Sequence, residues 1–209
     1  MYAQWNPISY KVIYVGGAGT SGSTAQTTCY YDTPCTLTAN GFSKPGYSFS
    51  KWTNGSNEYS NQGQVTNLST TDNGTITLTA QWEPNKYTIN FGKNGGDGTT
   101  SNVECTYDSD CVLTTNGYSK DGYTFNGWSY GGNTYGDGAT VRNIAQSGSI
   151  TLNAIWKANN YTIQFDGNGA NGGSTANMSC TYGVEYPLRT NGFTKTGYHF
   201  TGWTYDNND

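Results

Sequence analysis

This sequence is poor in charge: its 209 residues include 10 Lys and Arg against 14 Asp and Glu, for a net charge of -4. The basic residues stand singly, so no cluster is available to neutralise the phosphates of a nucleic acid. Long apolar runs are also missing, since none approaches the roughly 20 residues that span a bilayer. The N-terminal MYAQWNPISY lacks the basic, apolar and small segments of a signal peptide. We expect no nucleic-acid partner and no membrane insertion in this stretch.

Groups for catalysis and metal binding are scarce as well. The one histidine, His199, lies between Tyr198 and Phe200, where it is expected to face solvent rather than act as a general base. The carboxylates do not recur in a useful pattern, and no CxxC pair or neighbouring histidine completes a zinc ligand set. The sequence therefore predicts no catalytic, cofactor-binding or metal site and no cofactor. It is not expected to be an enzyme.

Aliphatic residues are few, and aromatic residues take their place. Only 33% of the residues are hydrophobic and 29 are glycine, a composition that by itself favours disorder. However, 18 Tyr and 6 Trp supply large side chains that a folded core can bury. These rings recur in phase with Val, Ile and Leu. We therefore expect a folded, mainly β protein.

The chain repeats itself with a period of about 70 to 77 residues. GYSFSKW (46–52), GYTFNGW (122–128) and GYHFTGW (197–203) end at Trp52, Trp128 and Trp203, which are 76 and 75 residues apart. A second series, LTAQW and LNAIW, ends at Trp82 and Trp156, and YAQW ends at Trp5. We divide the chain into the tail of a preceding repeat with its connector (1–9), repeat 1 (10–82), a connector (83–86), repeat 2 (87–156), a connector (157–160) and a truncated repeat 3 (161–209). The chain is expected to be a piece of a longer array.

Strand signals dominate within each repeat. YTINF (87–91) alternates Tyr, Ile and Phe with polar residues, and TITLTAQW (75–82) alternates in the same way, as strands with one buried face do. Gly/Asn clusters such as GKNGGDG (92–98) supply turns between them. The only candidate helix is one turn near 67–73. The connectors hold four residues each, so neighbouring repeats are expected to sit end to end with limited swing.

The recurrent GYxFxxW motif is interpreted as core. Tyr123 and Phe125 share a face, whereas Trp128 has the opposite parity, which suggests a bulge near Gly127 or a Trp that serves the other side. A repeat with so few aliphatic residues needs its aromatic side chains inside to offset chain entropy. The alternative is an aromatic platform that stacks on sugar rings. The expected core residues are Tyr47, Phe49, Trp52, Trp82, Tyr123, Phe125, Trp128, Trp156, Tyr198, Phe200 and Trp203.

Together these motifs resemble the Listeria–Bacteroides repeat, also called the internalin B-repeat. The resemblance rests on Y-x-[VI]-x-[FY], N-G-[FY]-[ST]-K-x-G-Y-x-F-x-x-W and I-T-L-x-A-x-W, and it covers essentially the whole chain. It implies small α+β, β-grasp-like units in tandem on secreted or wall-attached bacterial surface proteins. Members of that family are mostly spacers and adhesion modules without a catalytic site.

The cysteines depart from the simplest form of that pattern. Cys29 and Cys35 are six residues apart, as are Cys105 and Cys111, and the polar loops between them fit hairpins whose flanking residues are close enough for disulfides. Such bonds imply an oxidising compartment. Free thiols in a cytosolic protein and a metal site are the competing interpretations. Cys180 has Tyr186 in place of its hairpin partner and is expected to be a free thiol, the alternative being a pairing outside the hairpin.

The expected function is that of a non-catalytic spacer or stalk in a secreted or cell-surface bacterial protein, with adjacent repeats of the chain as its contacts. The alternative is an adhesin module that binds a glycan or a protein of a host or neighbouring cell. Identical cations at one-repeat intervals could engage an anionic polymer by multivalency. The candidate ligand contacts are Lys44, Lys120 and Lys195 with Tyr59, Tyr130 and Tyr135.

Overall fold

The structure, a computed structural model, describes residues 1–205, so the last four residues assigned to repeat 3 lie outside the described residues. The ordered elements of this range are all strands, which confirms the mainly β class. The helix of an α+β unit is absent from residues 1–205, as is the helical turn near 67–73, where Asn67 and Asn73 have positive φ angles of 53° and 57°. Neither asparagine can therefore be part of a right-handed helical turn. The same range holds no helix fit to cross a bilayer.

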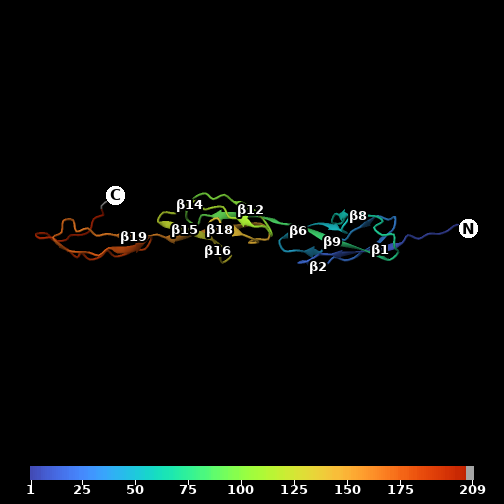
Figure 1. Ribbon diagram of the computed structural model, residues 1–209, viewed down its shortest axis with the longest axis horizontal. Helices are drawn as coiled ribbons and strands as arrows, with labels where there is room; N and C mark the ends of the chain where they lie inside the picture. Colours follow the sequence, from blue (N-terminus) through green and yellow to red (C-terminus); the bar gives the residue numbers. More distant parts are fainter. Residues whose placement is uncertain (206–209) are drawn as a thin grey trace. The chain divides into compact units, whose positions relative to one another are not determined.

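Repeat 1 forms one five-stranded sheet and two short two-stranded pairs. Its strands are β1 (Ser9–Val15), β2 (Ser21–Gly22), β3 (Thr27–Tyr30), β4 (Cys35–Thr36), β5 (Phe42–Ser43), β6 (Tyr47–Thr53), β7 (Glu58–Tyr59), β8 (Gln64–Val65) and β9 (Gly74–Pro84). The sheet order is β3-β1-β9-β6-β7, and Figure 1 shows β1, β6 and β9 together in the blue to green part of the chain. β1 and β9 are parallel, whereas the other neighbours are antiparallel.

The core of repeat 1 lies on one face of this sheet. Alternation along β1 buries Tyr10 and Val12, and alternation along β9 buries Leu78 and Ala80, as the period-2 pattern predicts. Trp52 is completely buried in the same cluster. Its ring packs against three other aromatic rings, those of Tyr14, Phe42 and Phe49, with centroids 4.8, 6.2 and 4.9 Å away. Truncating a ring buried in this way typically costs about 3 to 5 kcal/mol.

A bulge brings the tryptophan of the GYxFxxW motif onto the core face. In β6 the pairing with β9 shifts between Phe49 and Lys51. In repeat 2 the corresponding shift lies between Phe125 and Trp128. Gly127 has a φ of +105° at that point. The bulge thus exists in both repeats, although only the second one uses a glycine in the left-handed region.

Repeat 2 is built from the same elements. Its strands are β10 (Lys86–Gly92), β11 (Asp97–Gly98), β12 (Val103–Thr106), β13 (Cys111–Val112), β14 (Tyr118–Ser119), β15 (Tyr123–Tyr130), β16 (Asn133–Tyr135), β17 (Thr140–Val141) and β18 (Gly148–Ala158). The sheet order β12-β10-β18-β15-β16 matches that of repeat 1. By contacts the chain forms two compact units, one of residues 1–91, 101–115 and 138–152, the other of the remaining described residues. β18 contributes to both of them.

Repeat 3 contains β19 (Asn160–Ile163), β20 (Gly172–Gly173), β21 (Met178–Thr181) and β22 (Phe193–Thr194). They correspond to β1, β2, β3 and β5, and β19 pairs with β21 as β1 pairs with β3. Residues 197–203 form no strand, because within residues 1–205 nothing takes the place that β9 and β18 take beside β6 and β15.

The residues expected in the core differ in burial, because a strand pairs with the motif in repeats 1 and 2 but not with residues 197–203. Trp52 and Trp128 are completely buried, and Tyr47, Phe49, Trp82, Tyr123, Phe125, Trp156 and Trp203 are half-buried. Tyr198 and Phe200 are exposed, at 74% and 49% of their surface, so placing them in the core was wrong for this chain. Their face is open because no strand covers it.

Both predicted disulfides are present. Cys29 joins Cys35 and Cys105 joins Cys111, each with a Cα–Cα distance of 5.6 Å. Each closes a six-residue separation, for which the loop-entropy model gives about 2 kcal/mol of stabilisation. Cys180 is free and buried.

The connectors are shorter than expected. β9 continues to Pro84 and β10 begins at Lys86, which leaves only Asn85 between repeats 1 and 2. In the same way, only Asn159 separates β18 from β19. Strand pairing extends into both expected connectors, and the chain passes from one repeat to the next through a single residue.

Candidate functional site: the joints between repeats

The first joint is organised around Asn85. Its backbone N–H donates to the carbonyl of Gly46 at 2.9 Å, and its carbonyl accepts from the N–H of Tyr107 at 2.8 Å. Its side-chain oxygen accepts from the Ser48 hydroxyl at 2.6 Å, and its side-chain nitrogen donates to the carbonyl of Gln146 at 3.1 Å. Backbone and side chain of one residue therefore bond to both repeats. Four hydrogen bonds restrict the rotation of the link.

The second joint repeats most of these bonds around Asn159. Its N–H donates to the carbonyl of Gly122 at 2.9 Å, and its carbonyl accepts from the N–H of Tyr182 at 2.8 Å. Its side-chain oxygen accepts from the Thr124 hydroxyl at 2.6 Å. The identical placement of an asparagine in both connectors thus has a structural reason.

A glycine and two tyrosines form the packed part of the first joint. The Tyr47 ring lies edge-on to the Tyr107 ring, with centroids 5.6 Å apart and an angle of 72° between the planes. Gly46 has a φ of +77°, and a Cβ atom there would come within 2.3 Å of the Tyr107 ring. Only glycine permits both the backbone conformation and the approach of this ring. The glycine of the GYxFxxW motif is therefore a contact residue.

The second joint has the same packing. The rings of Tyr123 and Tyr182 lie 5.6 Å apart at 76°. Gly122 has a φ of +76°, and a Cβ atom there would come within 2.2 Å of the Tyr182 ring. The Gly-Tyr turn of one repeat and the loop tyrosine of the next thus form a reproducible pair. Edge-on aromatic pairs contribute about 0.5 to 1.5 kcal/mol beyond their buried area.

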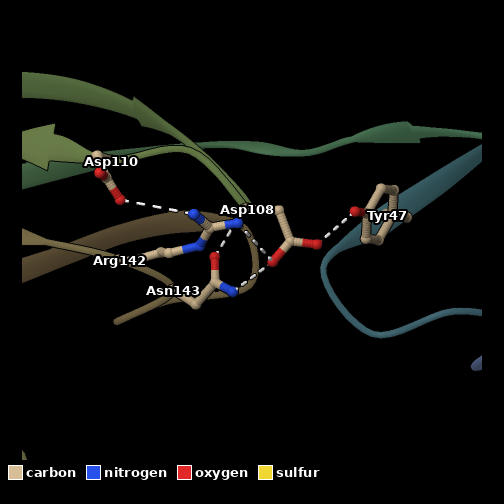
Figure 2. A network of polar contacts seen from close by, with 5 residues as sticks. All are labelled: Tyr47, Asp108, Asp110, Arg142 and Asn143. Carbon is tan, nitrogen blue, oxygen red and sulfur yellow. Dashed lines mark hydrogen bonds and ion pairs between the residues drawn. The ribbon is translucent and has the colours of Figure 1, made fainter.

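The first joint also holds a carboxylate (Figure 2). The Tyr47 hydroxyl donates to Asp108, and Asn143 donates through its side-chain nitrogen to the other oxygen of Asp108 at 2.6 Å. The Asn143 side-chain oxygen accepts from the Asp108 N–H at 2.6 Å. Arg142 lies between two acids, 3.9 Å from Asp108 and 3.6 Å from Asp110. Asp108 therefore connects a strand of repeat 1 to two segments of repeat 2.

These contacts shift two pKa values. The hydrogen bond from Tyr47 and then that from Asn143 lower the pKa of Asp108 below its usual range, with a smaller contribution from Arg142. The bond to Asp108 raises the pKa of Tyr47 above its ordinary value. Because Asp108 is exposed and Tyr47 is only half-buried, we attribute only a small stabilisation to the pair. The shift shows that the joint favours the ionised carboxylate.

Tyr107 and Asp108 both lie in the loop that the Cys105–Cys111 disulfide closes. The disulfide and the Asp108–Asn143 hydrogen bonds therefore hold the surface that receives the Gly-Tyr turn. Repeat 1 contains the same arrangement, since Asp32 and Asn67 form two hydrogen bonds of 2.6 and 2.8 Å above the Cys29–Cys35 loop.

The corresponding loop of repeat 3 is built differently. Gly183 stands where Asp108 stands in repeat 2, and a Cβ atom there would lie 3.3 Å from the Tyr123 hydroxyl. Tyr186 takes the place of the second cysteine, and its hydroxyl accepts from the N–H of Thr181 at 3.3 Å. Within residues 1–205 the Tyr123 hydroxyl has no hydrogen-bond partner. The second joint therefore keeps the ring pair but has neither the carboxylate nor the disulfide.

The three recurrent lysines lie on the tyrosines of the Gly-Tyr turns, two of which belong to the joints. The ammonium groups of Lys44, Lys120 and Lys195 lie 4.1, 4.6 and 5.0 Å from the ring centroids of Tyr47, Tyr123 and Tyr198. Lys195 also donates to the carbonyl of Asn168 at 3.0 Å. Each lysine thus makes a cation–π contact with the tyrosine three residues further along. This gives the recurrence of the lysines a structural reason.

The tyrosines predicted to accompany them lie elsewhere. Tyr59 is paired with Trp52 across the β6–β7 hairpin, and Tyr135 is paired with Trp128 across β15–β16. Tyr130 lies in the same hairpin, and all three tyrosines are half-buried. Among residues 1–205, no hydrogen bond, ion pair or ring contact joins these tyrosines to the lysines. The predicted ligand contacts therefore do not form one cluster.

Sequence reasoning missed the main residues of the joints, namely Gly46, Asn85, Tyr107, Asp108, Gly122, Asn143, Asn159 and Tyr182. One signal was available, because asparagine occupies the third position of EPNK and of KANN. The tyrosine two residues after the first cysteine of each loop was another. No group of three or more His, Cys, Asp or Glu side chains suited to a metal ion occurs in residues 1–205.

Comparison with known proteins agrees with this repeating architecture. The profile of the Listeria-Bacteroides repeat domain matches residues 10–81, 87–155 and 161–209. The chain belongs to the Listeria-Bacteroides repeat family. The three matched segments coincide with the three repeats seen in the structure, and the joint residues Asn85 and Asn159 fall between them.

Two relatives come from Evansella cellulosilytica, and their names describe one as a Gly-rich membrane protein and the other as a membrane protein. The first is 34% identical over 99% of this chain, and the second is 28% identical over 97%. The chain spans 23% and 30% of the length of these relatives. It is thus similar to a repeat region within larger proteins.

Proposed function

We propose that this Listeria-Bacteroides repeat region is a non-catalytic spacer, which holds other parts of a larger bacterial surface protein apart and lies outside the cell. The observation that carries the proposal is the joint. A single asparagine, hydrogen-bonded to both neighbours, links each repeat to the next. A spacer needs successive units that keep their orientation, and a joint with few free rotations supplies it.

The disulfides support the extracellular part of the proposal. Disulfides persist in secreted and surface proteins, whereas the reducing cytosol disfavours them. Here they close the loops of repeats 1 and 2 that carry Asp32 and Asp108, each of which is hydrogen-bonded to an asparagine of its own repeat. The relatives named as membrane proteins are consistent with a cell-surface location.

The chemistry of the joints supports a structural rather than a catalytic role. Asp108, a carboxylate whose pKa is lowered, already accepts hydrogen bonds from Tyr47 and Asn143. The histidine, His199, is exposed. We therefore propose that the region itself catalyses no reaction and requires no cofactor.

An adhesin that binds a glycan or a protein of another cell is the competing proposal. It was based on the recurrent lysines and on Tyr59, Tyr130 and Tyr135. Because each lysine already contacts the tyrosine of its own Gly-Tyr turn and the other tyrosines are half-buried, the spacer is favoured.

The spacer proposal is tested by the distance distribution across the first joint. Spin labels on unnatural amino acids at the exposed positions Ser56 and Val112 leave the disulfides intact. We expect a narrow distribution for the native chain and a broad one when Asn85 is replaced by a flexible Gly-Ser linker. Equal widths in the two proteins would mean that the joint does not hold the repeats, and the spacer proposal would be rejected.

Binding arrays separate the spacer from the adhesin. The folded chain is applied to glycan and surface-protein arrays beside a heat-unfolded, reduced control. We expect no saturable binding that depends on folding. If the folded chain binds, and replacing Lys44, Lys120 and Lys195 with Gln abolishes that binding, the adhesin proposal replaces the spacer.

A further inference from the structure

The two strands that connect repeat 1 to the rest of the chain are its first and its last. The chain enters repeat 1 at Ser9, where β1 begins, and leaves it at Pro84, where β9 ends. These two strands are direct neighbours in the sheet and run parallel to each other. Any tension along the chain therefore reaches repeat 1 through the β1–β9 pair.

The parallel direction of the two strands decides how tension acts on them. Tyr10 lies opposite Gly74 and Val15 lies opposite Thr79, so both strands begin at the same end of the pair. Tension pulls β1 by its beginning and β9 by its end. The strands are therefore pulled in opposite directions along their own length, which is shear. The hydrogen bonds of a parallel pair are evenly spaced, so they resist shear together rather than one after another.

Further hydrogen bonds hold the point where tension enters the repeat. The Ser9 N–H donates to a side-chain oxygen of Asp72 at 3.2 Å, and the Asn73 N–H donates to the carbonyl of Ser9 at 2.8 Å. The carbonyl of Ile8 accepts from the N–H of Tyr31 at 3.0 Å. The beginning of β1 is thus bonded to the residues before β9 on one side and to the disulfide-closed loop on the other. It cannot detach without breaking bonds on both sides.

Buried side chains shield the pair from water on the core face of the sheet. Tyr10 and Val12 of β1 and Leu78 of β9 are completely buried. A hydrogen bond that water does not reach is lost under tension before a bond to water can replace it. On its other side β9 is paired with β6, where Phe49 lies opposite Trp82. Movement of β9 therefore breaks the sheet in the middle and opens the whole repeat.

We propose that the β1–β9 pair is a load-bearing clamp, by which repeat 1 transmits tension along the chain without unfolding. The proposal goes beyond the spacer, because a spacer keeps orientation whereas a clamp resists force. It rests on the proposed function only in that tension reaches the pair where the region joins other parts of a larger protein. The first and last strands of repeat 2, β10 and β18, are neighbours in the same sheet order, so a clamp is expected there as well.

The disulfide of repeat 1 limits how far the repeat extends once the clamp has opened. The separation of six residues between Cys29 and Cys35 would stretch to about 20 Å, whereas the disulfide holds their Cα atoms 5.6 Å apart, so reduction should lengthen the unfolding step by roughly 15 Å. This change of length identifies the unfolding of repeat 1 in a force trace.

Pulling the folded 209-residue chain in two directions tests the clamp. Force handles on unnatural amino acids at the exposed positions Asn6 and Glu83 load β1 and β9 in shear. Handles at Asn6 and Thr71, which is also exposed, pull the beginnings of the two strands apart and load their hydrogen bonds one at a time. The rupture force should be several-fold higher in shear. Equal rupture forces in the two directions would overturn the proposal.

Two equal truncations in one core give a matched control. Val12 of β1 and Val65 of β8 are both buried in the core cluster of repeat 1. Val12→Ala weakens contacts that break as the clamp opens, whereas Val65→Ala weakens contacts that are still formed at that stage. Forced unfolding follows the unfolding rate, which only the first kind of contact changes.

Val12→Ala should therefore lower the rupture force in shear, and Val65→Ala should leave it close to that of the native chain. Denaturant unfolding, measured in parallel, should show a loss of stability in both variants. Equal rupture forces in the two variants would contradict the clamp, because the force would then report overall stability instead of the β1–β9 pair.

The rupture forces and the distance distribution across the first joint answer separate questions. A joint that is narrowly distributed only in the native chain, together with equal rupture forces in both pulling directions, retains the spacer and rejects the clamp. Equal widths in the native chain and in the Gly-Ser linker variant, together with a higher force in shear, reject the spacer and retain the clamp.

Discussion

The two joints of this chain share one design and differ in how their receiving loop is held. Both contain a connecting asparagine, a glycine in the left-handed region and an edge-on tyrosine pair with centroids 5.6 Å apart. The first joint adds Asp108, and its loop is closed by the Cys105–Cys111 disulfide. In the second, the loop carries Gly183 and Tyr186 at the corresponding positions.

The comparison separates what a joint requires from what strengthens it. The ring pair and the backbone hydrogen bonds occur in both joints, so they are sufficient to bring the Gly-Tyr turn onto the next repeat. The carboxylate and the disulfide are additions that restrain the receiving loop in repeat 2. The first joint is therefore expected to be the stiffer one, and the four predictions below test this difference.

The largest effect is expected from the glycine that both joints share. Gly46→Ala and Gly122→Ala should each open their own joint, because the new Cβ atom would strike the tyrosine ring at 2.3 or 2.2 Å. The left-handed conformation adds about 1 to 2 kcal/mol of strain. Gly55→Ala is the matched control, since Gly55 has a φ of +93° and no atom within 4 Å. Thermal unfolding should show a larger loss of stability for both joint variants than for Gly55→Ala. Equal losses of stability in all three variants would mean that the contact with the tyrosine ring does not contribute.

Reduction of the disulfides should loosen the first joint and leave the second one unaffected. Breaking each closed loop removes about 2 kcal/mol of stabilisation from repeats 1 and 2, and repeat 3 has no disulfide to lose. Adding a reductant should therefore broaden the distance distribution across the first joint and leave the second unchanged. A Cys105→Ser, Cys111→Ser double variant in non-reducing buffer is the control for effects of the reductant. Broadening of both joints alike would contradict the assignment of the loop.

Acid should weaken only the first joint. Since the folded state lowers the pKa of Asp108, the stabilisation is fully present above the ordinary carboxyl pKa of about 3.9 and is lost as the pH falls through the lowered value. The ring resonances of Tyr47, followed by NMR during acidification, should report this loss. The Asp108→Asn variant should abolish that transition in Tyr47, and a transition that persists in the variant would assign it to another carboxylate.

The smallest effect is expected from adding the missing carboxylate to the second joint. Gly183→Asp would place its Cβ atom 3.3 Å from the Tyr123 hydroxyl. The carboxylate attached to that atom would then be within reach of a hydrogen bond from the hydroxyl. Asp108 itself has a φ of +58°, so an aspartate tolerates this backbone conformation. The variant should narrow the distance distribution across the second joint slightly. Gly183→Ala is the control, and an equal narrowing in both variants would exclude the carboxylate as the cause.

Much of the fold was predictable from local patterns. Alternation of apolar residues identified the strands that became β9 and β10, because a sheet with one buried face imposes that period. The six-residue cysteine spacing identified both disulfides, because hairpin geometry brings such positions together. The opposite parity of Trp128 indicated the bulge that the pairing of β15 shows.

The joints were less predictable, because their residues are distant in sequence. Tyr47 and Asp108 are separated by 61 positions, and nothing in the local pattern of either segment indicates the other. The lysines were predicted as ligand contacts because their cation–π contacts with the tyrosines become evident only when the turn is folded. Tyr198 and Phe200 were placed in the core by analogy, and whether a strand covers them is decided by pairing rather than by their own motif.

The sequence by itself determined the period, the strands and the positions of the disulfides. These follow from residue types and short spacings, through side-chain alternation and ring closure. The tertiary structure alone decided that Asn85 and Asn159 are the whole link between repeats, and that the same Gly-Tyr turn meets a carboxylate in one joint and a glycine in the other. Those outcomes depend on which surfaces are brought together after each repeat has folded. The sequence of a repeated motif does not specify which residues of the next repeat it will contact.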